Sequence, residues 1–227
     1  MTGPLRPPVL VCFAVREEAA PFRRVLPGHV TVVVSGMGPA AAETAARQHL
    51  AAHDWSAVFT CGFAGGLNPA LARGTVLCDA DDAFPFRARL LAAGALPARF
   101  HCADRVATTA SGKTALRERT GADAVEMESG IIRRLCREHD VPCATVRVIS
   151  DAAGDDLPLD FNALMTADQR LHPGRLAWAI LRSPSVIGGL LQLRRRCVLA
   201  ARRLDGVLVD ALSRLSVGGS QATCRGD

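Results

Sequence analysis

Two acidic clusters in the middle of the chain have the residue types and spacing that acid–base chemistry requires. The first is Val125-Glu126-Met127-Glu128, and the second is the run RVISD, which ends in Ser150-Asp151. The residues between them predict a helix over 131–139 and a strand over 144–149. A strand–helix–strand unit brings two strand ends to one edge of a parallel sheet, where open α/β folds build their sites. Glu128 and Asp151 are therefore expected to face one pocket.

Short apolar runs alternate with helical patterns along the whole chain. Strands are expected at 9–14, 30–35, 57–63, 75–78, 106–109, 122–126 and 143–150. Helices are expected at 17–26, 39–52 and 129–139, and from 161 onward with breaks at Pro173-Gly174 and Pro184. This order predicts an α/β fold with a central parallel or mixed sheet flanked by helices. We expect a single domain over residues 1–227, because no linker or repeat divides the chain.

Composition argues against several classes of protein. No apolar run approaches the ~20 residues of a membrane-spanning helix, and residues 1–8 lack the layout of a secretory signal. A cytoplasmic protein is therefore expected. The chain has eight cysteines without a C-x-x-C pair, which favours free thiols over disulfides or a zinc site, so no metal and no cofactor are expected. The net charge is +5, but the chain has no tyrosine and few aromatics to stack on bases, so nucleic-acid binding is not expected.

The two acidic clusters and three earlier segments resemble the superfamily of purine nucleoside phosphorylases and nucleosidases. The earlier segments are FAVREE at 13–18, SGMG at 35–38 and CGFAGGL at 61–67. Together the five segments are most similar to the methylthioadenosine/S-adenosylhomocysteine nucleosidase branch, over about residues 9–165. The resemblance implies a nucleoside phosphorylase-like fold that cleaves an N-glycosidic bond, and it implies a homo-oligomer.

Cleavage of a purine N-glycosidic bond needs a proton for the leaving base, a partner for the ribose and an activated nucleophile. By resemblance, Asp151 donates the proton to purine N7, and its place after an apolar strand favours a protonated carboxyl. Glu128 accepts hydrogen bonds from the ribose hydroxyls and stabilises positive charge on the sugar. Met127 packs on the ribose, and Val125 and Glu126 contribute mainly backbone. Ser150 belongs to the same RVISD run as Asp151.

Glu18 matches the carboxylate that positions and deprotonates the nucleophilic water in nucleosidases. An ordinary acidic first turn of a helix is the alternative interpretation of Glu18. Ser35 and Gly36 lie in a glycine turn whose backbone N–H groups could approach an anion or a hydroxyl. In phosphorylases this neighbourhood helps to hold phosphate, so inorganic phosphate stays open as a co-substrate.

Several positions depart from the family pattern. Phe63 stands where nucleosidases usually have a small hydroxyl residue, and the phosphate-binding arginine of hexameric phosphorylases has no counterpart in 57–60. Ala115, in a segment that resembles the S-G-D loop, stands near the place of an aromatic that stacks on the purine. The connections 79–105 and 116–126 are shorter than usual, which is expected to open the pocket on the side of the 5′ substituent.

The C-terminal segment, about 185–212, has apolar residues at helical spacing and a face rich in arginine. It is either a helix packed on the sheet or an interfacial helix that makes peripheral membrane contact. With the opened pocket, it resembles the hopanoid-associated phosphorylase subgroup, which implies removal of adenine from adenosylhopane at the inner face of the membrane. The absence of the phosphate-binding arginine and the presence of Glu18 favour water as the acceptor, whereas the subgroup's name implies phosphate.

Three other functions remain open, and a fourth is disfavoured. A methylthioadenosine/S-adenosylhomocysteine-type nucleosidase or a purine nucleoside phosphorylase would act on soluble nucleosides. A catalytically silent nucleoside-binding module would keep the fold without the activity. A Rossmann-type dehydrogenase is disfavoured, because residues 16–18 are Arg-Glu-Glu where a G-x-G-x-x-G turn would be needed.

Overall fold

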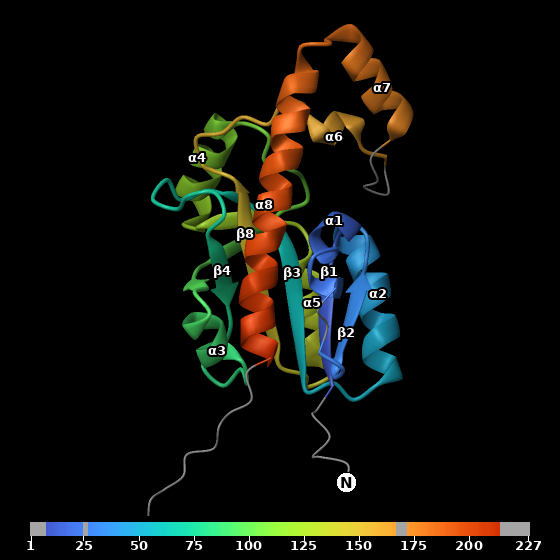
Figure 1. The fold of residues 1–227 in the computed structure, drawn as a ribbon, viewed down its shortest axis with the longest axis vertical. Coiled ribbons are helices and arrows are strands. Elements are labelled where there is room, and N and C mark those ends of the chain that lie inside the picture. Colours follow the sequence, from blue (N-terminus) through green and yellow to red (C-terminus); the bar gives the residue numbers. More distant parts are fainter. Residues whose placement is uncertain (1–7, 25–26, 167–171, 214–227) are drawn as a thin grey trace, which may run out of the picture.

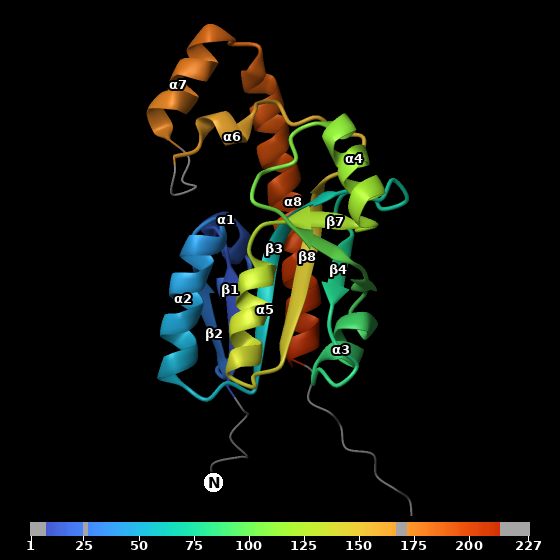
Figure 2. The same ribbon diagram turned by 180° about the vertical axis from the view of Figure 1, so that it is seen from behind.

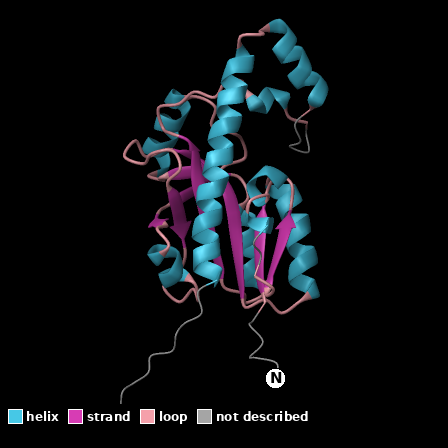
Figure 3. Cartoon of the chain, viewed as in Figure 1, coloured by secondary structure: helices cyan, strands magenta, loops and turns pink. Residues whose placement is uncertain are grey.

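A twisted central sheet with helices on both faces forms the body of the molecule (Figures 1 and 3). The computed structural model describes residues 8–24, 27–166 and 172–213. The strands are β1 (Val9–Phe13), β2 (Val30–Val34), β3 (Ala57–Gly66), β4 (Val76–Asp79), β5 (Leu96–Pro97), β6 (Phe100–Cys102), β7 (Ala124–Glu126) and β8 (Cys143–Asp151). The helices are α1 (Arg16–Ala19), η1 (Phe22–Arg24), α2 (Pro39–Ala52), α3 (Arg87–Ala92), α4 (Ala110–Thr120), α5 (Ser129–Glu138), α6 (Phe161–Leu164), α7 (Pro173–Arg182) and α8 (Val186–Ser213).

The sheet is mixed, as the sequence predicted. Its main path runs β2-β1-β3-β8-β4-β5. Neighbours among β2, β1, β3 and β8 pair in parallel, whereas β4 pairs antiparallel with β8. The carboxyl ends of β1, β3 and β8 consequently meet at one edge, which is where an open α/β sheet forms its site.

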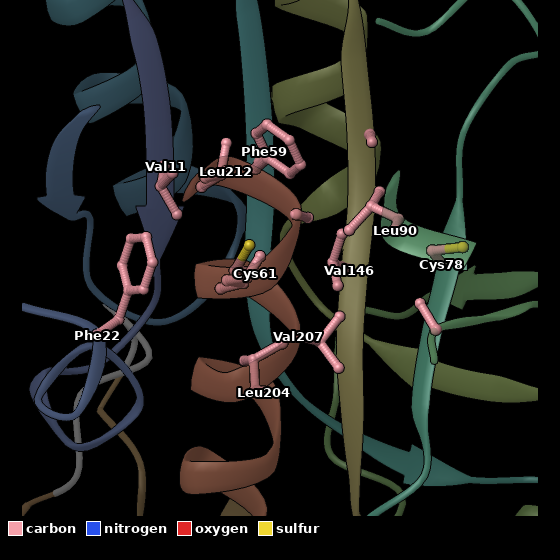
Figure 4. Packing of buried hydrophobic residues seen from close by; sticks show 14 of the residues in the cluster. Val11, Phe22, Phe59, Cys61, Cys78, Leu90, Val146, Leu204, Val207 and Leu212 are labelled. Atoms are coloured by element: carbon pink, nitrogen blue, oxygen red, sulfur yellow. The ribbon is translucent and has the colours of Figure 1, made fainter. Parts of the chain in front are cut away.

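Alternation along β1 divides the core into two layers. Val9, Val11 and Phe13 belong to a buried cluster with α8, whereas Leu10 and Cys12 belong to another with α2 and α5. Successive strand residues point to opposite faces, so one strand contributes to both layers. Figure 4 shows the first layer, in which side chains of α8 reach the sheet, and Figure 2 shows α2 and α5 on the opposite face.

The strand–helix–strand unit expected around the acidic clusters has a different geometry. β7 pairs antiparallel with the end of β3, Gly65 opposite Val125, and parallel with β6. β7 and β8 are therefore not neighbouring parallel strands, and that prediction was wrong. The pairing with β3 nevertheless brings residues 126–128 to the same edge of the sheet as the end of β8 (Figure 2).

Other expected elements were correct in part. Residues 39–52 form α2 as predicted, and the helix expected at 17–26 is divided into α1 and η1, with 25–26 outside the described residues. Residues 106–109 form no strand. Residues 111–116, which resemble the S-G-D loop, lie in helix α4. Thr109 caps this helix, and its Oγ1 accepts from Gly112 N at 3.1 Å. The elements α3, β5 and β6 were not predicted.

The two halves of α8 have different environments. Residues from Ala200 to Leu212 bury seven side chains against the sheet, whereas Ile187 and Leu191 are about half exposed, at 44% and 52%. Packing on the sheet therefore holds for the second half only. No helix among the described residues is long and apolar enough to cross a bilayer.

The second half of α8 should contribute strongly to stability. Leu208 is fully buried, so Leu208→Ala should lower the free energy of unfolding by about 2–5 kcal/mol through lost burial and the cavity left behind. Leu199→Ala is the matched control, because this leucine of the same helix is 62% exposed. Urea denaturation of both variants measures the difference, and equal effects would contradict the assignment of residues 200–212 to the core.

Candidate active site

A cavity of about 240 Å³ lies at the edge where β1, β3 and β8 end. Most of the predicted site residues line it, and these are Glu18, Phe63, Val125, Glu126, Met127, Glu128, Ser150 and Asp151. Ser35 and Gly36 are not in the lining, although Met37 is. The backbone N–H groups of Ser35 and Gly36 donate to Phe13 O and Ala14 O, at 2.9 and 3.0 Å. They are consequently not directed at the cavity.

Glu18 is a buried carboxylate that backbone N–H groups hold in place. One of its oxygens accepts from Ala14 N and Val15 N, both at 3.0 Å, and the other accepts from Phe63 N at 2.8 Å. Burial raises the pKa of Glu18 to about 7, although the charge of Arg147 and the bond from Phe63 oppose the rise. A carboxyl poised near neutral pH and fixed at a cavity wall suits a general base.

Arg147 is the buried cation that balances the acidic cluster. Its Nη2 donates to Glu126 at 2.5 Å and to Glu128 at 3.3 Å, and its Nη1 donates to Cys61 O at 3.2 Å. Burial lowers the pKa of Arg147, but the charges of Glu126, Glu128 and Glu18 outweigh the effect of burial, so the pKa is raised. The charge of one guanidinium therefore acts on three carboxylates.

The two glutamates beside Arg147 differ in their environment. Although burial raises the pKa of Glu126, Arg147 and bonds from Ser129 and Glu128 N outweigh it, and the net pKa is lowered. Burial raises the pKa of Glu128, and Arg147 compensates only in part. Glu128 also accepts from Gly38 N at 3.0 Å. Both glutamates line the cavity, but Glu126, at the end of β7, is held as an anion by Arg147 and the first turn of α5, whereas Glu128 has fewer partners.

Asp151, at the end of β8, is tied to two neighbours. Ser150 Oγ lies 2.6 Å from Asp151 Oδ1, and Lys113 forms an ion pair with Oδ2. Lys113 is fully buried and belongs to α4. The carboxyl group of Asp151 is therefore oriented from behind while it lines the cavity.

The remaining walls are largely apolar. Phe63 is half-buried in the wall beside Glu18, Leu157 comes from the loop after β8, and Leu193 and Cys197 come from α8. Burial, with the charges of Asp151 and Glu18, raises the pKa of Cys197 to about 11, so this thiol is neutral at pH 7. Ala115 is exposed on α4 and does not line the cavity. No group of three or more His, Cys, Asp or Glu side chains in the described part of the chain could hold a metal ion.

Sequence reasoning missed three residues that shape this site. Arg147 was quoted only as part of a motif, although a charge inside an apolar strand signals a buried ion pair. Lys113 is the only lysine of the chain. At Gly62 φ is +151°, and an added Cβ would lie 2.6 Å from both Arg147 Nη1 and Glu18 Oε1, so only glycine leaves room for the two charged groups.

Comparison with known proteins identifies the family of this chain. The family model described as the phosphorylase superfamily matches residues 22–95 and 97–182. The chain belongs to the phosphorylase superfamily. Two curated relatives, the 5′-methylthioadenosine/S-adenosylhomocysteine nucleosidases of Mycobacterium bovis and Mycobacterium tuberculosis, are each 43% identical over 47 residues. These matches cover 21% of this chain and 18% of the relatives' own length.

Solved structures resemble this phosphorylase-superfamily chain in fold. The S-adenosylhomocysteine nucleosidase of Streptococcus pyogenes has a TM-score of 0.69 at 15% identity, over 95% of this chain and 100% of that one. The 5′-methylthioadenosine/S-adenosylhomocysteine nucleosidase of Neisseria meningitidis has a TM-score of 0.67 at 17% identity, over 92% and 100%. The futalosine hydrolase of Helicobacter pylori has a TM-score of 0.60 at 17% identity, over 89% and 97%.

Removal of the Arg147 charge should destabilise the protein. Arg147→Met leaves Glu126 buried without its cation, which for buried pairs costs about 3–5 kcal/mol. Arg134→Met is the control, because its ion pair with Glu138 is exposed and should leave the free energy of unfolding nearly unchanged. Urea denaturation distinguishes the two, and an Arg147→Met midpoint equal to that of the parent would contradict the buried network.

Proposed function

We propose that this chain cleaves the N-glycosidic bond of an adenine nucleoside, with water as the acceptor. The observation that carries the proposal is the grouping of Glu18, Glu128 and Asp151 around one largely apolar cavity. Each matches one requirement of the reaction: Glu18 as a general base for water, Glu128 as a partner for the ribose, and Asp151 as a route for the proton to the leaving purine.

The two ends of the glycosidic bond need opposite chemistry. The leaving purine needs a proton, because a purine anion leaves poorly, and Asp151 supplies it to N7. Glu128 accepts from the ribose hydroxyls and stabilises the positive charge that develops on the sugar. Glu18 takes the proton of the attacking water. Water is favoured over phosphate because no arginine stands in 57–60 and Arg147 is already paired with two glutamates, which leaves Arg105 as the arginine in the cavity lining.

We further propose a lipid-linked substrate, of which adenosylhopane fits best. The apolar wall that α8 contributes through Leu193 and Cys197 suits a hydrocarbon attached at the ribose 5′ position. The same helix continues away from the cavity into its exposed apolar half. The same three carboxyl groups would also serve a nucleosidase that acts on soluble nucleosides such as methylthioadenosine.

Release of adenine tests the proposed function directly. The protein is incubated with adenosine, methylthioadenosine and an adenosyl lipid, each with and without phosphate. We expect the fastest adenine release from the adenosyl lipid. The second product should carry a free hydroxyl group at C1′ of the ribose and no phosphate. Release from the soluble nucleosides alone would refute the lipid-linked substrate, and absence of adenine from all three would refute the function. A rate that scales with phosphate and yields a sugar 1-phosphate would refute hydrolysis.

The pH dependence of activity should report Glu18. Its pKa is raised from the ordinary carboxyl value to about 7, so the basic form is lost as the pH falls through that value. The ratio kcat/KM should therefore decrease about tenfold per pH unit below pH ~6, and Glu18→Gln should lose turnover at every pH. Glu17→Gln is the matched control, because Glu17 is exposed on the same helix. A flat acidic limb in the parent would contradict the role of Glu18.

We also propose that α7 and the first half of α8 contact an anionic membrane. Figure 1 shows these helices beyond the end of the sheet. Trp178 and Leu181 are 58% and 77% exposed, and Ile187 and Leu191 add apolar surface on α8. Exposed arginines on the two helices are Arg175, Arg182, Arg194 and Arg195. Apolar surface beside basic side chains is the usual basis of interfacial binding, with about 1 kcal/mol for each basic residue near the surface.

Flotation with phosphatidylglycerol vesicles tests this contact. The parent should float with the vesicles at low salt and dissociate at high salt, because salt screens the attraction. The double variant Trp178→Ser and Leu181→Ser should lose flotation, whereas Leu96→Ser, on edge strand β5 and 46% exposed, should retain it. Flotation that both variants retain, or none in the parent, would contradict the membrane contact.

A further inference from the structure

Lys113 is a fully buried ammonium group immediately behind the cavity. Its Nζ donates to Asp151 Oδ2, to Ala152 O at 2.9 Å and to Asp155 O at 3.0 Å. A lysine ammonium has three N–H groups, so each of them meets an oxygen. The site thus satisfies the charged form of Lys113 completely, at a depth where an unpaired ammonium would be very costly.

The arrangement puts Lys113 and Asp151 in series. Asp151 lines the cavity and Lys113 does not, so a ligand in the cavity meets the carboxyl group first and the ammonium lies on its far side. The other carboxyl oxygen of Asp151 lies 2.6 Å from Ser150 Oγ. Asp151 is therefore the group through which Lys113 can act on a ligand.

The loop after β8 has anchors besides Lys113. Asp155 forms an ion pair with Arg73 and accepts from Ala152 N at 2.7 Å. Asp156 Oδ1 accepts from Ala110 N at 2.7 Å, which ties the loop to α4. Because these contacts already hold the loop, a buried charge directed at Asp151 points to the chemistry of that carboxyl group.

We propose that Lys113 supplies, through Asp151, the proton that the leaving adenine takes up. The inference rests on the proposed function. As the bond between C1′ and N9 breaks, its electron pair moves to the base, and Asp151 passes a proton to N7. An N–H bond of Lys113 breaks, its electron pair stays on Nζ, and the proton moves to Asp151. Glu18 takes the proton of the attacking water, and exchange with solvent returns Lys113 and Glu18 to their starting forms. Lys113 acts through Asp151 and is therefore a positioning residue.

The leaving group separates this role from simple loop anchoring. Adenine needs a proton to depart, whereas 4-nitrophenolate is a stable anion near neutral pH and needs none. Lys113→Met keeps the length and the apolar stem of the side chain and removes the transferable proton. We therefore expect Lys113→Met to lose about 10²–10⁴-fold in kcat on adenosine, the range of general acid catalysis, and to stay within a few-fold of the parent on 4-nitrophenyl β-D-riboside.

Two further variants keep the test decisive. Lys113→Arg retains a cation if Lys113→Met does not fold, but guanidinium does not give up its proton, so it should show the same selective loss on adenosine. Arg73→Gln is the matched control: it removes a contact of the same loop, to Asp155, and should leave the ratio of the two rates unchanged.

The outcomes are distinct. Equal losses on both substrates in the Lys113 variants would make Lys113 a structural anchor and overturn the inference. Undiminished adenine release by Lys113→Met would show that Asp151 obtains its proton elsewhere, and this would also overturn it. Failure of the proposed function appears in the parent enzyme instead: a parent that releases no adenine while it cleaves 4-nitrophenyl riboside refutes both the function and the inference.

Discussion

The site depends on one buried guanidinium that faces several carboxylates at the ends of strands. Arg147 extends from β8 beneath β3, where Gly62 leaves room for it, and it meets Glu126 from β7 and Glu128 from the start of α5. Buried carboxylates are costly without a cation, so the cluster could not exist at this edge without Arg147. Burial raises the pKa of Glu18 and of Glu128, and the charge of Arg147 offsets the rise only in part. The network that holds the fold thus also sets the protonation of the site.

The sequence predicted those features of the fold that arise from local patterns. The buried strands and the helix α2 follow from apolar runs and an alanine-rich segment, and the acidic motifs were placed correctly at the sheet edge. The direction of β7 was wrong, because the pattern of residues 122–126 is the same for a parallel and an antiparallel strand; only its pairing with Gly65 and Gly66 decides. Helix α4 was missed because residues 111–116 resemble a family loop, although Thr109 caps a helix there and Leu116 is buried on it.

Partners distant in sequence were beyond the reach of pattern analysis. The residues that Arg147 contacts lie in β3, β7 and at the start of α5, and nothing in the strand itself names them. The two roles of α8 are a similar case. Its helical spacing of apolar residues predicts one amphipathic face, but the environment of that face changes along the helix. Leu204 and Leu208 contact the sheet, Leu193 and Cys197 line the cavity, and Leu191 is exposed to solvent. The core and the cavity wall are therefore parts of one rigid element.

Glu18 and Asp151, on two sides of the cavity, have opposite environments. Glu18 is surrounded by N–H donors of the backbone and by apolar walls, so burial governs it and leaves it poised to accept a proton near neutral pH. Asp151 has instead a fully satisfied ammonium behind it and the hydroxyl of Ser150 beside it. Asp151 ends β8 and Glu18 lies on α1, directly after β1, so the parallel pairing of β1, β3 and β8 places both groups at one edge of the sheet. The proposed base, Glu18, and the proposed acid, Asp151, thus face one cavity from elements joined to the same sheet.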